Sequence, residues 1–293
     1  MNKSKKFAIW GNTEKPKFWD TFPGILKWAK SNKTSPYLTT RIDKQYKYHK
    51  YPIIEKADDF NDMDFILTIG GDGTILSTAR AIAHRNIPIL GIHLGDLGFM
   101  AKVTLSELYH RLDQVAAGNF SISDYMVLEA EMSANGKTIK SSVLNEVVVN
   151  NGKTHRMVNC MLEANDKFIS KYKADGIIVS TPTGSTAYSL SAGGPIVEPS
   201  VKSIIITPIC PHSLTSRPLV VPDTTEIKIT FPVDPSEDIG VTLDGQIFHN
   251  FNYEAVITVR KAKYTIKFID FADCNYYETL RNKMGWGKRG EEQ

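Results

Sequence analysis

The sequence has few of the features that mark secreted, membrane-spanning or metal-binding proteins. It contains 3 cysteines in 293 residues, and their odd number and wide spacing predict neither a disulfide framework nor a cysteine metal site. No apolar run approaches the ~18 residues that a membrane span needs, and Phe7–Trp10 is too short for a signal-peptide core. We therefore expect a cytoplasmic protein with no membrane contact.

Several familiar site patterns are also missing. No Gly-x-Gly-x-x-Gly lies between a predicted strand and a helix, and Gly136–Thr138 and Gly152–Thr154 lack the glycine five residues upstream that a P-loop requires. The 7 histidines include no helix-spaced pair. A formal charge of +3 is too small to indicate nucleic-acid binding. The short basic-aromatic run Tyr46–Tyr51 favours a solvated edge or loop over a nucleic-acid surface.

Composition and length are those of an ordinary globular protein, with 42% hydrophobic and 23% charged residues. A chain of 293 residues predicts one large domain or two of usual size. Strand and helix patterns alternate up to about residue 120, and short strands follow. We expect a doubly wound, Rossmann-like α/β domain over residues 1–122 and an all-β domain over 123–275. A tail, 276–293, should pack back on the first domain, with its last residues frayed.

In the first domain, Phe7–Trp10 predicts a strand, and the helical spacing from Phe18 to Ala29 predicts a helix that begins or bends at Pro23. No element can be assigned to residues 31–63. Thr104 and Glu107 fit a capping box, and Gly118 suits the end of that helix.

In the second domain, alternation around Leu128–Met132 predicts a strand, and Asn135–Gly136 is a hairpin turn signal. Val143–Val149 reads as one strand.

The stretch Phe65–Leu76 joins a buried strand, a turn with three glycines around Asp72, and the start of an apolar helix. In open α/β sheets, ligands bind outside the carboxyl ends of strands. Glycines there let phosphates approach the backbone, and a helix N-terminus attracts anions. One interpretation is a plain turn between two core elements. The flanking strand and helix favour the other, a phosphate site in which Asp72 accepts a proton or helps to hold a metal ion.

A second stretch, Asp175–Pro195, leads from a buried strand into a loop rich in hydroxyls and small residues. A Ser/Thr turn before a helix is one reading. The length of the polar run favours a site for a ligand with hydroxyls and phosphates, with Tyr188 available to stack on a flat base.

A third stretch places Asn145 and Glu146 together in an otherwise apolar strand. Buried polar groups cost ~1–3 kcal/mol unless they are paired, and ribose hydroxyls would pair them. An end-of-strand or bulge pair that faces water is an equally good reading.

These stretches together resemble the NAD kinase family. Gly70–Thr74 matches its glycine-aspartate motif, Asn145–Glu146 its Asn-Glu pair, and Asp175–Gly176 with Ser180–Pro195 its long signature. The resemblance covers most of the chain from about residue 64 onward. Further similar blocks are Pro208–Leu214, Arg217–Leu219, Asp244–Gln246 and Leu280–Trp286.

The resemblance implies an α/β domain, a β-sandwich-like domain and an active site in the cleft between them. It implies phosphoryl transfer from ATP or polyphosphate to the 2′-hydroxyl of the adenosine ribose of NAD, giving NADP, with a divalent ion such as Mg²⁺. It also implies a homodimer or homotetramer in which a neighbouring subunit helps to close the site. Two other functions stay open, a non-catalytic dinucleotide sensor and a lipid kinase that shares the glycine turn.

The same resemblance implies roles for individual residues. Asp72 is the proton acceptor that faces the 2′-hydroxyl, and Gly73 gives room beside it. Asn145 and Glu146 hold the adenosine and its ribose hydroxyls. Phe99 lines the pocket, and no protein metal ligand is implied. The remaining NAD contacts are Arg156, Lys173, Asp175, Thr186, Ala187, Tyr188 near the adenine, Ser189, Leu190, Ser191 and Gln246.

Overall fold

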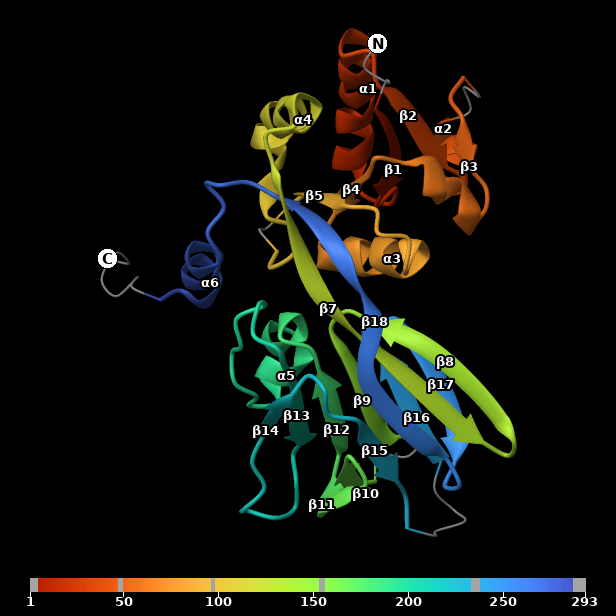
Figure 1. Cartoon of the computed structure of the whole chain (residues 1–293), viewed down its shortest axis with the longest axis vertical. Coiled ribbons are helices and arrows are strands. Elements are labelled where there is room, and N and C mark those ends of the chain that lie inside the picture. Colours follow the sequence, from red (N-terminus) through yellow and green to blue (C-terminus); the bar gives the residue numbers. More distant parts are fainter. Residues whose placement is uncertain (1–4, 47–49, 96–97, 153–155, 233–237, 287–293) are drawn as a thin grey trace. The chain divides into compact units, whose positions relative to one another are not determined.

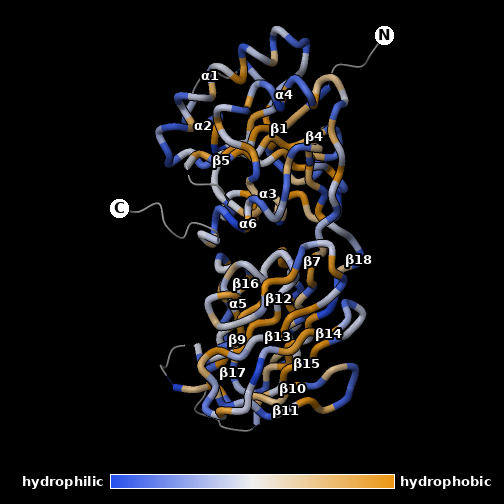
Figure 2. The backbone as a smooth tube through the Cα atoms, turned by 90° about the vertical axis from the view of Figure 1, so that its left-hand side faces the viewer, coloured by the Kyte–Doolittle hydropathy of each residue, from blue (hydrophilic) through white to orange (hydrophobic). Residues whose placement is uncertain are grey.

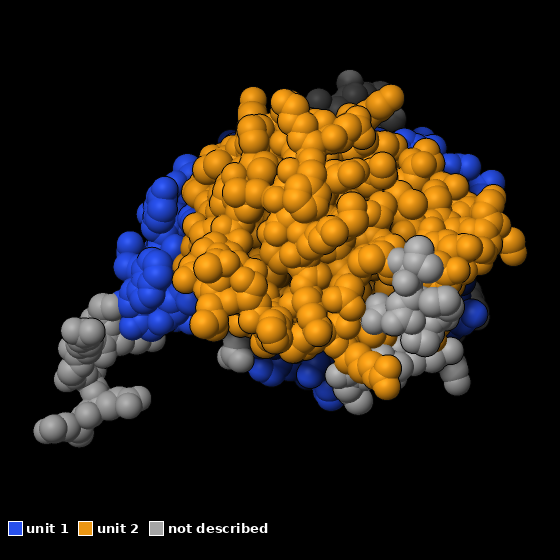
Figure 3. Space-filling model, turned by 90° about the horizontal axis from the view of Figure 1, so that it is seen from below, with its two compact units in different colours: residues 1–124, 266–293 blue, residues 125–265 orange. Residues whose placement is uncertain are grey.

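The computed structural model describes residues 5–46, 50–95, 98–152, 156–232 and 238–286. The chain divides into two compact units, which Figure 3 colours separately. The first contains residues 1–124 and 266–293, and the second contains residues 125–265. The expected frayed tail at 288–293 and the centre of the Tyr46–Tyr51 run lie outside the described residues.

The first unit is built on a parallel sheet with the strand order β3-β2-β1-β4-β5. The end of β18 (Val256–Asp270) pairs in parallel with β5 through Phe268 and Ile89, and the short β6 also pairs with β5. The expected doubly wound α/β arrangement is confirmed. The strands are β1 (Lys6–Gly11), β2 (Ser35–Thr39), β3 (Ile53–Ile54), β4 (Phe65–Gly70), β5 (Ile89–His93) and β6 (Val103–Thr104).

Helices cover both faces of this sheet (Figure 1). Phe7 and Ile9 of β1 enter a hydrophobic cluster with the buried faces of α1 (Pro16–Ser31) and α4 (Leu108–Ala117). On the other face, a Cβ at Gly91 of β5 would lie 2.7 Å from Ile75 Cδ1 of α3, so this glycine allows α3 to pack closely. Strand residues alternate between the two faces because side chains in a strand have a period of two.

The helix boundaries exclude one of two alternatives, a helix start at Pro23, and confirm another expectation. The first helix begins at Pro16, where a missing N–H costs nothing, and Pro23 lies inside it rather than at its start. Thr104 and Glu107 form the predicted capping box, and Gly118 ends that helix with φ +81°. The helices are α1 (Pro16–Ser31), α2 (Thr40–Tyr46), α3 (Asp72–Ile82), α4 (Leu108–Ala117) and α6 (Tyr276–Met284), with 3₁₀ turns η1 (Ala57–Asp62) and η2 (Leu105–Glu107).

Charged pairs attach the C-terminal segment to the first unit. Both terminal guanidinium nitrogens of Arg111 on α4 contact Asp273, at 2.8 and 2.9 Å. Lys102 lies 2.8 Å from Asp270 at the end of β18. Among the described helices, none is both long and apolar enough to cross a membrane.

The second unit consists of two β-sheets. One has the order β11-β10-β15-β18, with β7 on β18 and β8 on β7, and the other is an antiparallel sheet, β14-β13-β12-β9-β16-β17. A single hydrophobic cluster takes residues from both, including Leu162 of β10 and Val179 of β12. The hydrophobic stretches of these strands are visible in Figure 2. This confirms the expected β-sandwich-like unit.

Two turns in this unit test the sequence patterns. Asn135 and Gly136 both have positive φ, at 51° and 73°, and join β7 to β8 as a tight hairpin turn. The expected single strand over Val143–Val149 is wrong, because β8 ends at Val143 and β9 begins at Glu146. The chain breaks there because a carboxylate, described below, takes the backbone N–H groups.

Strands β7 (Ser121–Ala134) and β18 (Val256–Asp270) contain residues of both units. The second unit also holds β8 (Lys137–Val143), β9 (Glu146–Asn151), β10 (Val158–Ala164), β11 (Lys167–Ala174), β12 (Gly176–Ser180), η3 (Thr183–Thr186), α5 (Tyr188–Ser191), β13 (Ser203–Ile209), β14 (Leu219–Pro222), β15 (Ile227–Thr230), β16 (Asp238–Leu243) and β17 (Ile247–Asn252).

Candidate active site

Asp72 is the first residue of α3, directly after the glycine turn that ends β4. Its carboxylate binds the loop that follows β5. Oδ2 accepts a hydrogen bond from the N–H of Phe99 at 3.0 Å, and Oδ1 accepts from Met100 at 3.2 Å and Ala101 at 3.1 Å. Hydrogen bonds to a charged group are worth about 1.5–3 kcal/mol each. Asp72 therefore has a fixed orientation and fixes the loop.

Gly98 makes this approach possible. A Cβ at Gly98 would lie 2.0 Å from Asp72 Oδ1, which no real side chain tolerates. A carboxylate offers about four acceptor positions, and the loop uses three of them. The remaining position, on Oδ2, can accept the proton of a substrate hydroxyl. Asp72 is thus able to hold the loop and act as a proton acceptor at once.

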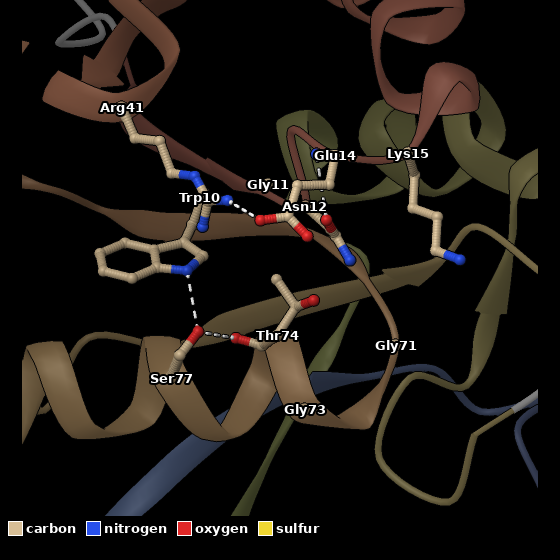
Figure 4. A pocket seen from close by; sticks show the side chains of 10 residues that line it. All are labelled: Trp10, Gly11, Asn12, Glu14, Lys15, Arg41, Gly71, Gly73, Thr74 and Ser77. Atoms are coloured by element: carbon tan, nitrogen blue, oxygen red, sulfur yellow. Dashed lines mark hydrogen bonds and ion pairs between the residues drawn. The ribbon is translucent and has the colours of Figure 1, made fainter. Parts of the chain in front are cut away.

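A pocket of about 410 Å³ lies at the start of α3, within the first unit (Figure 4). Gly71, Gly73 and Thr74 of the glycine turn form one side. The end of β1 and the following residues, among them Lys15, form another, and Arg41 of α2 a third. Asp72 does not line this pocket, because its side chain turns toward residues 99–101. The pocket therefore presents glycine backbone, a helix N-terminus and two cations, which suits phosphate.

In the second unit, the carboxylate of Asp244 binds three consecutive backbone N–H groups at the start of β9, as the carboxylate of Asp72 does in the loop after β5. Asp244 lies in the turn from β16 to β17 with φ +50°. Its Oδ2 accepts from the N–H of Leu144 at 3.1 Å, and its Oδ1 accepts from Asn145 at 2.8 Å and Glu146 at 3.2 Å. These bonds replace strand pairing at residues 144 and 145. They hold the backbone from which the side chains of Asn145 and Glu146 extend.

Asn145 and Glu146 are both buried, at 8% and 5% exposure, so the interpretation as a pair facing water is wrong. Within the described part of the chain, Asn145 Oδ1 and Glu146 Oε2 have no hydrogen-bond partner. Native proteins rarely leave buried polar atoms unpaired. Hydroxyl groups of a bound sugar would supply hydrogen-bond partners for both atoms.

Burial raises the pKa of Glu146 to about 8, and the nearby charge of Asp244 adds to the rise. The backbone N–H of Tyr188 donates a hydrogen bond to Glu146 and opposes this effect on its pKa. At pH 7 most Glu146 side chains therefore carry a proton. A protonated carboxyl group can donate one hydrogen bond and accept others, which matches a sugar hydroxyl.

Comparison with known proteins shows which family the chain belongs to. The ATP-NAD kinase N-terminal domain matches residues 25–120, and the ATP-NAD kinase C-terminal domain matches residues 144–271. The NAD kinase of Citrifermentans bemidjiense is 36% identical over 289 residues, which is 97% of this chain and 100% of that protein. The NAD kinase of Geobacter sulfurreducens is 38% identical over 286 residues, with the same coverage of both chains.

The chain belongs to the NAD kinase family.

Solved structures share the fold of this family member. A yeast NADH kinase complexed with NADH aligns with a TM-score of 0.89 at 23% identity, covering 100% of this chain and 91% of that one. An NAD kinase from Archaeoglobus fulgidus in complex with ATP aligns with a TM-score of 0.73 at 24% identity, covering 96% and 97%. At these identities the likeness extends to the fold alone.

The structure brings several residues of the NAD kinase motifs together at one end of β12. Ser180, the last residue of that strand, pairs with Glu146. Tyr188 begins α5 just beyond and is 45% exposed. Gln246 belongs to the turn that contains Asp244. The backbone N–H of Asp244 donates a hydrogen bond to the carbonyl of Glu146 at 3.0 Å.

Other predicted contacts lie at the opposite end of β12. Asp175 directly precedes Gly176, the first residue of that strand, and Lys173 is two residues earlier on β11. Arg156 comes two residues before Val158, which pairs with Ala174. β12 has 5 residues, so at ~3.3 Å per residue it separates the two groups by roughly 17 Å. Within one chain, these three residues do not gather around Glu146.

The side chains of the predicted hydroxyl-rich loop, residues 186–191, differ in burial. Ser189 is fully buried, and its Oγ lies 2.8 Å from Thr207 Oγ1 of β13. Ser191 is exposed, and Thr186, Ala187 and Leu190 are half-buried. The exposed and half-buried residues of this loop are therefore the ones that a ligand can reach.

Sequence reasoning missed two partners. The first is the backbone of residues 99–101, which binds Asp72; Gly98 within a glycine-rich turn was the available signal. The second is the set of hydrogen bonds that Asp244 accepts from the backbone of residues 144–146. The pair Asp244–Gly245, which follows an alternating strand, was a partial signal.

Proposed function

We propose that this protein phosphorylates NAD to NADP at the 2′-hydroxyl of the adenosine ribose. Membership of the NAD kinase family supports this activity. The observation that carries the position of the reaction is the buried pair Asn145 Oδ1 and Glu146 Oε2, which have no partner among the described residues. Ribose hydroxyls supply the donors and acceptors that this pair needs.

In this proposal Asp72 accepts the proton of the attacking hydroxyl. The 2′-oxygen forms a bond to the terminal phosphorus of the donor, the bond from that phosphorus to its bridging oxygen breaks, and the shortened donor leaves with the electron pair. Phosphoryl transfer has a loose transition state, so positioning and charge stabilisation supply most of the catalysis. The hydrogen bonds from residues 99–101 keep Asp72 in one orientation for this step.

The donor phosphates are placed at the pocket lined by Gly71, Gly73 and Thr74. Among the described residues, no three of His, Cys, Asp or Glu come together as a metal site. A Mg²⁺ ion therefore fits as a partner of the donor phosphates, since Mg²⁺ is usually held by substrate phosphates, waters and one or two carboxylates. Bound there, it would offset negative charge on the phosphates.

We further infer a homo-oligomer and a cytoplasmic location. Lys173, Asp175 and Arg156 are roughly 17 Å of strand away from Glu146, so their proposed contacts to NAD require a neighbouring subunit. The three cysteines are all free, which agrees with a reducing compartment.

One assay tests the activity. Purified protein is incubated with NAD or NADH, Mg²⁺, and either ATP or polyphosphate, and the 2′-phosphorylated dinucleotide is measured. We expect NADP together with ADP or shortened polyphosphate. Tight NAD binding without product would instead establish a dinucleotide sensor, and phosphorylation of a lipid but not of NAD would establish a lipid kinase.

A further inference from the structure

The backbone that holds Asp72 continues directly into a mostly buried ion pair. Ala101, whose N–H donates to Asp72 Oδ1 at 3.1 Å, is followed in the chain by Lys102. The ammonium group of Lys102 donates to Asp270 Oδ2 at 2.8 Å, at the end of β18. The last residue that Asp72 binds is therefore the direct neighbour of a residue whose side chain is held by a charge.

The carboxylate of Asp270 is itself fixed by further donors. The hydroxyl of Ser123 on β7 donates to its Oδ2 at 3.1 Å, and the N–H of Phe271 donates to its Oδ1 at 3.1 Å. The side chains of Lys102 and Asp270 are only 18% and 17% exposed. Charges attract each other more strongly where little water screens them. The pair therefore holds Lys102 more firmly than an ion pair at the open surface would.

The backbone after Lys102 is held by only a short stretch of sheet. β6 consists of two residues, Val103 and Thr104, which pair with β5. Successive Cα atoms are about 3.8 Å apart across a trans peptide, so a displacement of Lys102 is passed on to Ala101. A misplacement of about 1 Å at a reacting group costs up to roughly 10²-fold in rate. The anchor at Lys102 therefore affects how accurately residues 99–101 hold Asp72.

A second ion pair attaches the same C-terminal segment at a different place. Asp273 follows shortly after Asp270 in the chain and binds Arg111 of α4 at 2.8 Å. Both pairs thus connect the segment after β18 to the rest of the first unit. Of the two, the pair of Lys102 is the one that ends beside the backbone bound to Asp72. Comparison of the two pairs therefore separates attachment of the segment from positioning of Asp72.

We propose that Lys102 and Asp270 are positioning residues for the phosphoryl transfer. Their ion pair fixes the backbone of residues 99–102, and the N–H groups of residues 99–101 in turn fix the carboxylate of Asp72. The two side chains act through this backbone and are given no contact with NAD or with the phosphoryl donor. This inference rests on the proposed function, in which Asp72 accepts the proton of the attacking hydroxyl.

Five variants test this role. Asp270→Asn and Lys102→Met each remove one charge of the pair with little change in side-chain size, so the test remains available if one of them does not fold. Lys102→Arg keeps the positive charge and is the conservative exchange. Asp273→Asn is the matched control, because it makes the same substitution in the neighbouring ion pair. The double variant of Lys102→Met and Asp270→Asn shows whether the two residues act through each other.

The first measurement is amide hydrogen exchange of the full chain by mass spectrometry, on a peptide that covers residues 98–102. We expect exchange in this peptide to become about tenfold faster in Asp270→Asn and Lys102→Met, because the hydrogen bonds to Asp72 open more often. In Asp273→Asn and Lys102→Arg it should stay within about twofold of the wild-type rate. A peptide from β4 should exchange alike in all variants, which separates local from global opening.

The second measurement is steady-state kinetics with NAD and the phosphoryl donor. We expect kcat to fall about tenfold in Asp270→Asn and Lys102→Met, with the KM for NAD within about threefold of wild type. The KM is spared because Asn145 and Glu146, the proposed ribose contacts, belong to the second unit. The double variant should lose no more than the more damaging single variant. Asp273→Asn and Lys102→Arg should keep kcat within about twofold.

The inference is overturned if residues 98–102 exchange at the wild-type rate in both charge-removing variants, or if Asp273→Asn speeds their exchange as much. It is also overturned if kcat in both variants stays at the wild-type value, or if the losses of the two single variants add up in the double variant. A wild-type protein that makes no NADP would contradict the proposed function alone. The exchange experiment, which needs no substrate, would then still decide whether the ion pair fixes the backbone that holds Asp72.

Discussion

The two units contain the same hydrogen-bond pattern around an aspartate, in different surroundings. In each, one aspartate accepts three consecutive backbone N–H groups, two on Oδ1 and one on Oδ2: Asp72 from residues 99–101 and Asp244 from residues 144–146. Asp72 is half-buried and Asp244 is only 6% exposed. Asp244 also lies beside a second carboxyl group, that of Glu146, and contributes to the rise of its pKa to about 8.

In the proposed function, this difference separates a reacting group from a positioning group. The proposal gives the remaining acceptor position of Asp72 to the substrate proton. It lets Asp244, which is buried, act only through Asn145 and Glu146, whose backbone it holds. The same three hydrogen bonds would then support catalysis in one unit and substrate binding in the other.

The largest effect is expected from exchanging the first carboxylate. Asp72→Asn removes the proton acceptor, so we expect turnover to fall by ~10²-fold or more, the usual scale of acid–base assistance. NAD binding should stay within roughly tenfold, equivalent to about 1.4 kcal/mol. Steady-state turnover and the Kd for NAD, measured by calorimetry, check both values.

Asp244→Asn is the matched comparison. This change weakens the hydrogen bonds that hold the backbone of residues 144–146. We therefore expect the Kd for NAD to rise about tenfold while turnover at saturating NAD changes by less than about threefold. Equal losses of turnover in the two variants would show that the two aspartates play one role. Near-normal turnover in Asp72→Asn would remove Asp72 from proton transfer.

A smaller effect concerns pH and Glu146. Its pKa is raised from an unfolded value of 4.5 to about 8, so between these pH values the folded chain holds a proton that the unfolded chain has lost. The stabilising contribution is complete below about pH 4.5 and is lost as the pH rises toward 8. The free energy of unfolding should therefore fall with pH by up to ~1.4 kcal/mol per unit from this group.

Glu146→Gln removes this titration. Denaturant unfolding at pH 5, 6 and 7 should show a loss about 2–3 kcal/mol smaller across this range than in the wild-type protein. Identical pH dependence in the two proteins would mean that Glu146 is ionised in the folded state.

The smallest effect tests the loop that Asp72 holds. Gly98→Ala places a Cβ 2.0 Å from Asp72 Oδ1, and relieving such a contact typically costs ~1–3 kcal/mol. Gly95→Ala, in the same loop, has no heavy atom within 4 Å of the added Cβ and should change stability by less than ~0.5 kcal/mol. Denaturant unfolding compares the two, and similar losses in both would contradict a specific contact between Gly98 and Asp72.

Patterns within short stretches predicted much of the fold. The alternation of strands and helices indicated the parallel sheet, Thr104 and Glu107 marked a helix start, and Asn135–Gly136 marked a hairpin. These signals succeed because they depend on residues close in sequence. Val143–Val149 failed as one strand because the groups that interrupt it bond to Asp244, nearly 100 residues away.

Local patterns predicted that a buried strand, a glycine turn and a helix present Asp72, and that a polar pair interrupts an apolar stretch at Asn145–Glu146, because both are properties of neighbouring residues. Long-range packing decided what each carboxylate binds, since Asp72 lies 27 to 29 residues from its donors and Asp244 98 to 100. It also decided that Glu146 is buried enough to keep its proton and that Lys173 and Asp175 lie at the far end of β12. Packing brings distant residues together, and that packing sets the partners, burial and pKa on which the proposed chemistry depends.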